Sequence, residues 1–246
     1  MPRKAQTQSL ADSDAAPGGA AAVDRALSLL GAFRSGDSAL PLAELAQRSR
    51  LYKSTALRLL ASLEHARLVQ RLADGRYALG SEVARLHAIY AASFSLDRVV
   101  LPQLGRLVEA TGESAAYHVQ QGHGADAVRL CLYRVDSPHP VRDHIRAGDI
   151  LPLARGTGGR VLTAFDPARA KSGSAADRKL LAGIRERGYY AATGDRLAEV
   201  AGISAPVFHA DGTLAGAVTL TMPSHRYDAR YVKPVLEAAR RLSGAL

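Results

Sequence analysis

The sequence predicts a two-domain protein: an N-terminal winged helix-turn-helix, which is mainly α, a linker helix, and a C-terminal α+β domain with an antiparallel sheet. Two observations predict this fold class. Residues 42–79 read as a helix, a short turn, a second helix and a two-stranded hairpin. From residue 113 onward the pattern changes to alternating strands separated by glycine-containing turns. The predicted boundaries are a disordered tail over 1–20, the winged helix-turn-helix over 21–80, the linker helix over 81–95 and the C-terminal domain over 96–246.

Three helices are predicted before the hairpin. The first covers residues 22–33, where apolar residues share one face. The second starts after Pro41, which suits a first helical position, and ends at a turn over residues 49–52. In the third, KSTALRLLASLEHA, Ser54 or Thr55 is the predicted N-cap, because its hydroxyl can accept a hydrogen bond from an orphan backbone N–H. The predicted buried stripe of this helix is Ala56, Leu57, Leu60 and Leu63.

The hairpin is predicted to form the wing. LVQRL and RYAL alternate around Ala73-Asp74-Gly75, a turn signal. Leu40 is expected to add a short strand against this wing. A winged helix-turn-helix places its second helix in a DNA major groove.

Positive charge coincides with this motif. Residues 47–76 contain seven basic and two acidic residues, a net charge of +5 out of +9 for the whole chain. Cations on the second helix and the wing can reach phosphates beside the groove, and a solvated basic face is the alternative. The predicted DNA-binding residues are Arg50, Lys53, Ser54, Thr55, Arg58, Arg71 and Arg76.

The C-terminal sequence predicts an antiparallel meander with helices on one side. The predicted strands cover 113–121, 127–135, 141–145, 202–208 and 214–222. The predicted helices cover 96–111, 156–165, 175–187 and 229–246.

Motifs in the N-terminal part carry a specific resemblance. VDRALSLLGAF, LPLAELAQRSRLYKSTALRLLASLE and YALGSEVARL resemble, in order and spacing, the N-terminal domain of IclR-family transcriptional regulators. The Lys-Ser-Thr motif of that family appears at 53–55, its Arg-Leu-Leu at 58–60 and its Tyr-x-Leu-Gly signature at 77–80. Tyr52 stands where the family often has proline, and Arg67 where glycine usually ends the recognition helix. A left-handed backbone at Arg67 would carry strain.

The C-terminal part resembles the GAF-like effector domain of the same family, through Arg-Gly-Tyr, an Ala-Pro-Val strand and Ala-Val-Thr-Leu-Thr. This resemblance implies a pocket for a small-molecule effector. It also implies dimers that can pair into tetramers. Residues that match family pocket positions are His139, Arg142, Gly156, Thr157, Val200, Gly202, Thr219 and Thr221, with Asp195 close by.

The residues around this pocket predict an acidic ligand. Alternation along 141–145 would place Arg142 and His144 on one face of a strand, although such a face could equally be solvated. An arginine fork, the paired hydroxyls of Thr219 and Thr221, and the loop N–H groups of the glycine-rich turn together suit a carboxylate. The predicted effector is a small organic acid, for example an aromatic or a keto acid from a catabolic pathway, which binds without chemical change.

Other chemistry is less well supported by the sequence. The turn RGTGGR lacks the Gly-Lys-Ser/Thr ending of a nucleotide-binding P-loop. No histidine pair has a strong ligand spacing, so we predict no metal and no cofactor, although some family members are thought to bind zinc. Cys131 lies in an apolar strand pattern, which favours an inert thiol over a nucleophile.

These patterns predict a cytoplasmic DNA-binding transcriptional regulator and not an enzyme. Its expected partners are double-stranded DNA with a pseudo-palindromic operator, the organic acid and a second copy of the chain in a homodimer. No apolar run approaches the ~20 residues of a membrane span, and the N-terminus lacks the apolar segment of a signal peptide. Two alternatives are an enzyme acting on a small acid with a fused DNA-binding domain, and a constitutive DNA-binding protein without an effector.

Overall fold

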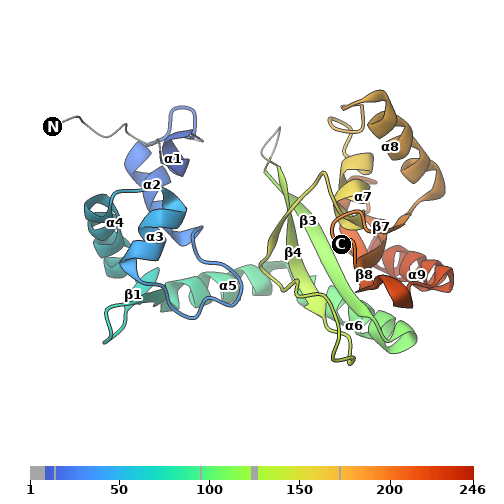
Figure 1. Ribbon diagram of the computed structural model, residues 1–246, viewed down its shortest axis with the longest axis horizontal. Coiled ribbons are helices and arrows are strands. Elements are labelled where there is room, and N and C mark those ends of the chain that lie inside the picture. The colour runs from blue at the N-terminus through green and yellow to red at the C-terminus, as the bar shows by residue number, and fades with distance from the viewer. Residues whose placement is uncertain (1–8, 14, 95, 123–126, 172) are drawn as a thin grey trace. The chain divides into compact units, whose positions relative to one another are not determined.

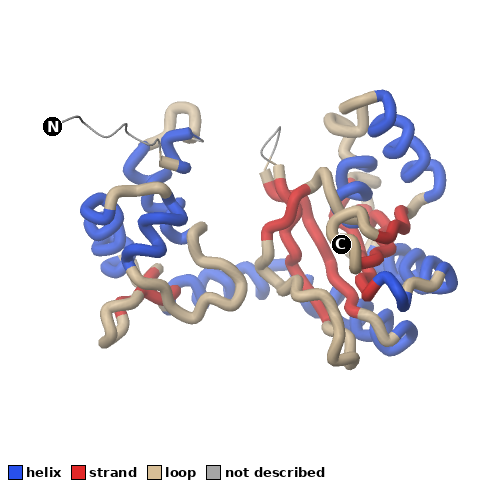
Figure 2. Tube along the Cα trace, in the orientation of Figure 1, coloured by secondary structure: helices blue, strands red, loops and turns tan. Residues whose placement is uncertain are grey.

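The computed structural model describes residues 9–246 apart from 14, 95, 123–126 and 172. The chain divides into two compact units, Met1–Phe94 and Ser95–Leu246. Figure 1 shows the elements of each unit, and Figure 2 shows that the N-terminal unit is mainly helical whereas the C-terminal unit is built on a sheet.

The N-terminal unit is a winged helix-turn-helix followed by a long helix, as predicted. Its core contains the fully buried side chains of Leu29, Leu45 and Leu60, one from each of three packed helices. Leu40 exchanges two backbone hydrogen bonds of 2.8 Å with Tyr77, so the predicted short strand against the wing is present as a bridge. The elements are α1 (Leu10–Ser13), α2 (Ala21–Leu30), α3 (Leu42–Ser49), α4 (Lys53–His65), β1 (Val69–Arg71), β2 (Tyr77–Leu79) and α5 (Ser81–Phe94).

A short helix stands within the tail that was predicted to be disordered over residues 1–20. Residues 1–8 and 14 lie outside the described part of the chain, but α1 packs on α2 through buried Ala11. The Ser9 hydroxyl accepts a hydrogen bond from the Asp12 N–H, and Arg25 lies 2.7 Å from the Asp12 carboxylate. One capping hydroxyl, one ion pair and one buried methyl group thus order a stretch whose composition predicted disorder.

The C-terminal unit is an α+β domain with a six-stranded sheet in the order β5-β4-β3-β8-β7-β6, in which every neighbouring pair is antiparallel. Two short 3-10 turns, Ser224–Arg226 and Ala229–Tyr231, precede its last helix. The elements are α6 (Leu96–Thr111), β3 (Ser114–Gln121), β4 (Val128–Val135), β5 (Ile150–Pro152), α7 (Thr157–Phe165), α8 (Ala175–Arg187), β6 (Tyr190–Thr193), β7 (Val200–Phe208), β8 (Leu214–Pro223) and α9 (Val232–Leu242).

Helices cover both faces of this sheet, so the prediction that they lie on one side is wrong (Figure 1). Helices α6 and α9 pack on the face that presents Val218 and Leu220, while α7 and α8 belong to a second apolar cluster beyond the other face. That other face carries small and hydroxyl side chains, among them Ser204 and Thr219. Small residues at this position let the N-terminus of α7 approach the sheet closely, which the strand patterns alone do not reveal.

Two strand assignments also differ from the prediction. Residues 141–145 form a loop, because the backbone of this segment pairs with no strand among the described residues. The side chains of Asp143 and Ile145, and a hydrogen bond from Arg226 to the Val141 carbonyl, attach it to the domain. The third strand is instead β5, which pairs with β4. The edge strand β6 was not predicted, since its four residues show no alternation between buried and exposed positions.

Candidate functional site

The recognition helix α4 presents a polar first turn. Its N-cap is Tyr52, which makes no side-chain capping hydrogen bond, so the predicted N-cap at Ser54 or Thr55 is wrong. The helix starts two residues earlier than a cap at Ser54 requires, and both hydroxyls therefore lie within its first turn. The side chains of Ser54 and Arg58 are exposed, and Thr55 is half-buried. This face of the helix is available to a groove of DNA.

Leu57 lies on the same exposed face. Its side chain is 46% exposed, whereas Ala56, Leu60 and Leu63 are buried. The predicted buried stripe is therefore correct except at Leu57, because the helix contacts the core over a narrower arc than its apolar residues span. An apolar side chain beside Ser54 and Arg58 can contact the methyl group of thymine.

The basic residues of this unit fall into two groups. Among the described residues, Arg50, Lys53 and Arg58 are exposed and have no acidic partner. Arg76 on the wing is paired with Asp74 at 2.7 Å, and Arg71 lies over the ring of Tyr77.

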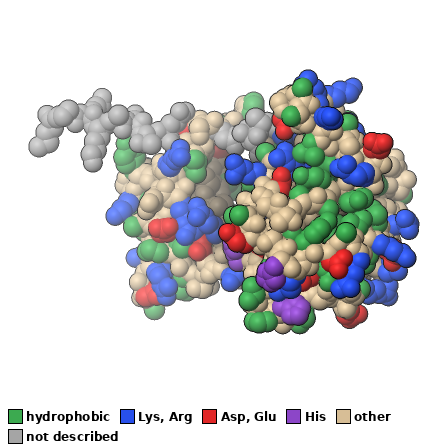
Figure 3. Space-filling view, turned by 45° about the vertical axis from the view of Figure 1, so that its right-hand side comes forward, with side chains coloured by type: hydrophobic (Ala, Val, Ile, Leu, Met, Phe, Trp, Pro, Cys, Tyr) green, Lys and Arg blue, Asp and Glu red, His purple; other side chains and the backbone are tan. Residues whose placement is uncertain are grey.

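Arg48 is internal to the fold, although its charge was counted with the basic surface. Its guanidinium donates to Asp37 at 2.5 Å, to Glu44 at 2.8 Å and to the Ala32 carbonyl at 3.0 Å. Exposed Arg67, which was not among the predicted contacts, has a φ of 58° and so adopts the left-handed backbone expected of a position where glycine is usual. On the face drawn in Figure 3, Lys and Arg side chains are spread over both units.

A cavity lies between the N-terminus of α7 and the polar face of the sheet in the C-terminal unit. Its volume is about 20 Å³, which is room for about one water molecule. It brings together seven of the nine predicted effector residues, from four segments of the chain. The lining residues are Arg129, Ile145, Gly156, Thr157, Ala192, Asp195, Arg196, Val200, Ala201, Gly202, Thr219 and Thr221.

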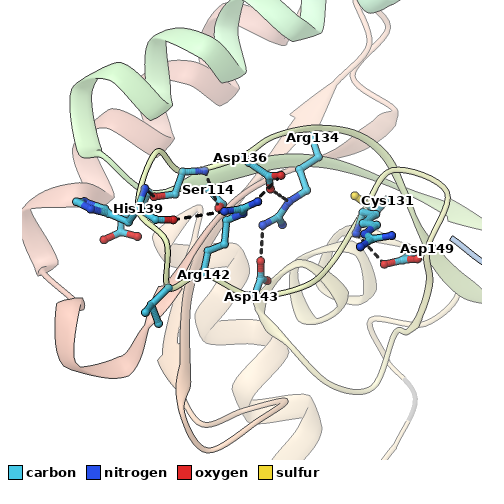
Figure 4. A network of polar contacts seen from close by, with 12 residues as sticks. Ser114, Cys131, Arg134, Asp136, His139, Arg142, Asp143 and Asp149 are labelled. Carbon is cyan, nitrogen blue, oxygen red and sulfur yellow. Dashed lines mark hydrogen bonds and ion pairs between the residues drawn. The ribbon is translucent and has the colours of Figure 1, made fainter. Parts of the chain in front are cut away.

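The other two predicted effector residues, His139 and Arg142, do not line this cavity. Arg142 is exposed and lies 3.6 Å from Asp136, and it donates weakly to the carbonyl of His139. Figure 4 shows Arg134 between Asp136 and Asp143, with the Arg142 side chain beside Asp136. Because residues 141–145 form no strand, the side chains of Arg142 and His144 are exposed, and Ile145 is the residue of this segment that lines the cavity.

A row of hydrogen-bonded side chains crosses the floor of the cavity. The Ser204 hydroxyl lies 2.8 Å from that of Thr157 and 2.9 Å from that of Thr219. Thr219 in turn lies 3.2 Å from Nδ1 of His118, which is fully buried. Burial, followed by the nearby Arg129, lowers the pKa of His118 well below its usual range, so this imidazole is neutral at physiological pH.

Two arginines at the cavity escaped the prediction. Arg129 on β4 is only 2% exposed, and desolvation lowers its pKa to about 10. Arg196 is half-buried, 3.8 Å from Asp143, and its pKa is also lowered by burial. A signal for Arg129 was present in the sequence, because it alternates with Cys131 and so shares the inward face of that strand.

Asp195 accepts a hydrogen bond from the Gly156 N–H, a loop donor that was expected to bind the ligand. Its carboxylate accepts a 2.5 Å hydrogen bond from the Gly156 N–H and lies 3.5 Å from Arg160. The φ of Gly156 is 80°, a backbone that favours glycine, and this turns the chain into α7. The Gly156 N–H of the glycine-rich turn therefore already donates to an aspartate of the same unit.

Other candidate chemistry finds no support in the described residues. No three His, Cys, Asp or Glu side chains among them come together as a metal site would require. Cys131 is fully buried, and burial raises its pKa to about 12, so the thiol is inert. Within the same part of the chain, no helix has the length and apolar character needed to cross a membrane.

Both units match known protein families. The family description "IclR helix-turn-helix domain" fits residues 22–73, and "Bacterial transcriptional regulator IclR C-terminal" fits residues 173–245. The HTH-type transcriptional regulator BhcR of Paracoccus denitrificans is 30% identical in an alignment that covers 92% of this chain and 87% of that protein. The glycerol operon regulatory protein of Streptomyces coelicolor is 29% identical over 81% of this chain and 83% of its own.

The fold is shared with solved structures. An IclR homolog from Microbacterium hydrocarbonoxydans, crystallised in complex with 4-hydroxybenzoate, superposes with a TM-score of 0.77 at 24% identity. The superposition covers 90% of this chain and 97% of the other. This likeness supports the two-unit architecture described above.

Proposed function

The chain belongs to the IclR family of DNA-binding transcriptional regulators, and on that premise we propose that its C-terminal unit binds a small organic acid that controls a catabolic operon. The observation that carries the proposal is the cavity, where buried Arg129 and the hydroxyls of Thr157 and Thr219 surround a small space. A cationic fork and hydroxyl donors suit a carboxylate. The relative solved with 4-hydroxybenzoate supports an aromatic acid as one ligand class.

The proposed DNA contacts divide by role. Lys53, Ser54, Thr55 and Arg58, on the first turns of α4, face base edges in this motif. Arg50, Arg71 and Arg76 contact phosphates, which position the protein without reading sequence. Arg76 first has to leave Asp74, and the exposed pair costs little to break.

A matched pair of variants tests this division. Arg58→Ala is expected to weaken binding to the operator by about 1–3 kcal/mol while binding to random DNA falls less. Arg71→Ala is expected to weaken binding to both DNAs alike and to flatten the salt dependence of both. Shift assays at several salt concentrations measure these effects. Equal losses on operator and random DNA for Arg58→Ala would assign that residue to a phosphate.

The active form proposed is a homodimer, which can pair into a dimer of dimers, on a pseudo-palindromic operator in the cytoplasm. The exposed apolar side chains of Val23 and Leu27 on α2 and of Leu86 on α5 support it, because a partner would cover them. Two winged helices also supply the contact area that one lacks. A monomer at micromolar concentration in light scattering, or an operator without dyad symmetry, would contradict the proposal.

The deciding experiment is a shift assay on the DNA upstream of the gene, with and without a panel of organic acids. An acid that alters the shift without being consumed supports an effector. Turnover of that acid by purified protein would favour an enzyme with a fused DNA-binding domain. Failure of every acid to change the shift or to raise thermal stability would favour a constitutive DNA-binding protein.

A further inference from the structure

We propose that the guanidinium of Arg129 binds the carboxylate of the effector at the floor of the cavity. The inference rests on the proposed function of this cavity. It replaces Arg142, the arginine that the sequence pattern favoured, with one that the sequence did not single out.

Arg129 carries a buried charge without a partner. Only 2% of the residue is exposed. No acidic oxygen among the described residues lies within ion-pair distance of it, and its Nε has no hydrogen-bond partner there. A buried cation is costly unless it is paired, so this position favours the arrival of an anion.

The neighbouring carboxylates are engaged elsewhere. Asp143 is paired with Arg134 and lies near Arg196. Asp195 accepts from the Gly156 N–H and faces Arg160. Neither carboxylate forms an ion pair with the guanidinium of Arg129.

The guanidinium fork faces the start of α7. A Cβ built on Gly158 would lie 2.6 Å from Nη1 of Arg129, and one built on Gly156 would lie 3.1 Å from Nη2. Both terminal nitrogens therefore lie against the two glycines, where the first N–H groups of the helix have no partner within it. An anion in the cavity would therefore lie beside both the fork and the helix N-terminus and can accept hydrogen bonds from each of them.

The shape and surroundings of the site favour a carboxylate. A planar carboxylate matches the two parallel donors of the fork. The space of about 20 Å³ holds about one water molecule, so the cavity has to widen to admit the rest of the acid. The Thr219 hydroxyl lies 2.8 Å from the same Gly158 Cβ position, so it also borders the anion site. Ile145, Ala192 and Val200 line the remaining wall and suit a short apolar body.

The test is calorimetry on the full chain with acetate, pyruvate, benzoate and 4-hydroxybenzoate, together with the neutral amide of each. Arg129→Met removes the charge and keeps an unbranched apolar side chain, Arg129→Lys keeps the charge without the fork, and Arg142→Met is the matched control. We expect the acids to bind wild type and Arg142→Met equally. Binding should fall roughly 10- to 100-fold in Arg129→Met, so that acid and amide bind alike, and by an intermediate factor in Arg129→Lys.

A second readout separates a binding role from a merely structural one. Without any acid, Arg129→Met should melt at a higher temperature than wild type, because it removes an unpaired buried charge. With acid, its melting temperature should no longer rise. If Arg129→Met does not fold, Arg129→Lys carries the test through its intermediate affinity.

The outcomes distinguish the two levels of the proposal. Acids that bind wild type and Arg129→Met with the same affinity would overturn the role of Arg129 and leave the effector function intact. Amides that bind wild type as tightly as the acids would also overturn it. Binding of no acid by wild type would overturn the proposed function, and the inference with it. Preference for inorganic phosphate over every acid would show an anion site of a different class.

Discussion

Gly80, the last residue of the Tyr-x-Leu-Gly signature, leads to a quantitative prediction for the N-terminal unit. A Cβ at this position would lie 2.1 Å from the Arg67 carbonyl oxygen and 2.7 Å from its carbonyl carbon. These are backbone atoms, and Arg67 is already held in a left-handed conformation. The obstacle therefore cannot be relieved by rotating a side chain.

The expected cost of Gly80→Ala follows from what must separate. The Arg67 carbonyl would have to move by roughly 1 Å to reach an ordinary contact distance. That shift strains two hydrogen bonds, from the Gly80 N–H to the Leu68 carbonyl at 2.8 Å and from the Glu82 N–H to the Arg67 carbonyl at 3.1 Å. Each is worth about 0.5–1.5 kcal/mol, and overpacking adds about 1–3 kcal/mol. Gly80→Ala should thus destabilise this unit by about 2–6 kcal/mol.

Hydrogen exchange read by mass spectrometry measures this effect separately in each unit. In Gly80→Ala, amides of residues 42–79 should lose protection by about 2–6 kcal/mol, while amides of the C-terminal unit stay unchanged. Gly105→Ala is the control, because a Cβ at this position in α6 meets no atom within 4 Å. That change should stabilise α6 by about 1 kcal/mol. Protection of residues 42–79 within about 0.5 kcal/mol of wild type in Gly80→Ala would refute the steric argument.

Three further predictions concern His118, Cys131 and Arg48. The pKa of His118 is lowered by burial, so the folded chain binds fewer protons than the unfolded chain below about pH 6.5. Stability is fully present above that pH and is lost as the pH falls, by up to about 1.4 kcal/mol per pH unit, and His118→Gln should remove this slope from urea unfolding curves. Cys131, whose pKa is raised to about 12, should react with a thiol reagent at pH 8 only in denaturant; fast labelling of native protein would contradict its burial. Arg48→Met should destabilise the N-terminal unit by about 2–4 kcal/mol, yet leave the salt dependence of DNA binding unchanged, because the Arg48 guanidinium is paired with Asp37 and Glu44.

Local patterns were sufficient to predict the wing and most of the sheet. Ala73-Asp74-Gly75 specifies a turn, and period-two alternation specifies its flanking strands over a few residues each. The effector cavity is different, because His118, Ser204 and Thr219 come from three strands. They meet only once β3, β8 and β7 are paired in their observed register. No spacing in the sequence encodes that pairing.

The error at residues 141–145 has the same origin. Alternation there predicted a strand, but the backbone of this segment pairs with no strand in the described part of the chain. The side chains of Asp143 and Ile145 and the bond from Arg226 to the Val141 carbonyl hold it instead. Arg142 was therefore assigned the contact with the ligand carboxylate that we propose for Arg129. Alternation reports which residues face inward and does not report what lies opposite them.

The row of hydroxyls at the cavity floor has a polarity. Each hydroxyl has one proton, so Ser204 can donate to either Thr157 or Thr219 and must accept from the other. If a bound molecule accepts a hydrogen bond from Thr157, then Thr157 accepts from Ser204, and Ser204 accepts from Thr219. Thr219 must then accept from Nδ1 of His118, which therefore carries a proton. If the molecule instead donates to Thr157 and each of these hydrogen bonds reverses its direction, the His118 proton lies on Nε2, which has no partner among the described residues. The tautomer of a buried histidine, readable by nitrogen NMR, would therefore report the hydrogen-bonding character of a molecule four hydrogen bonds away.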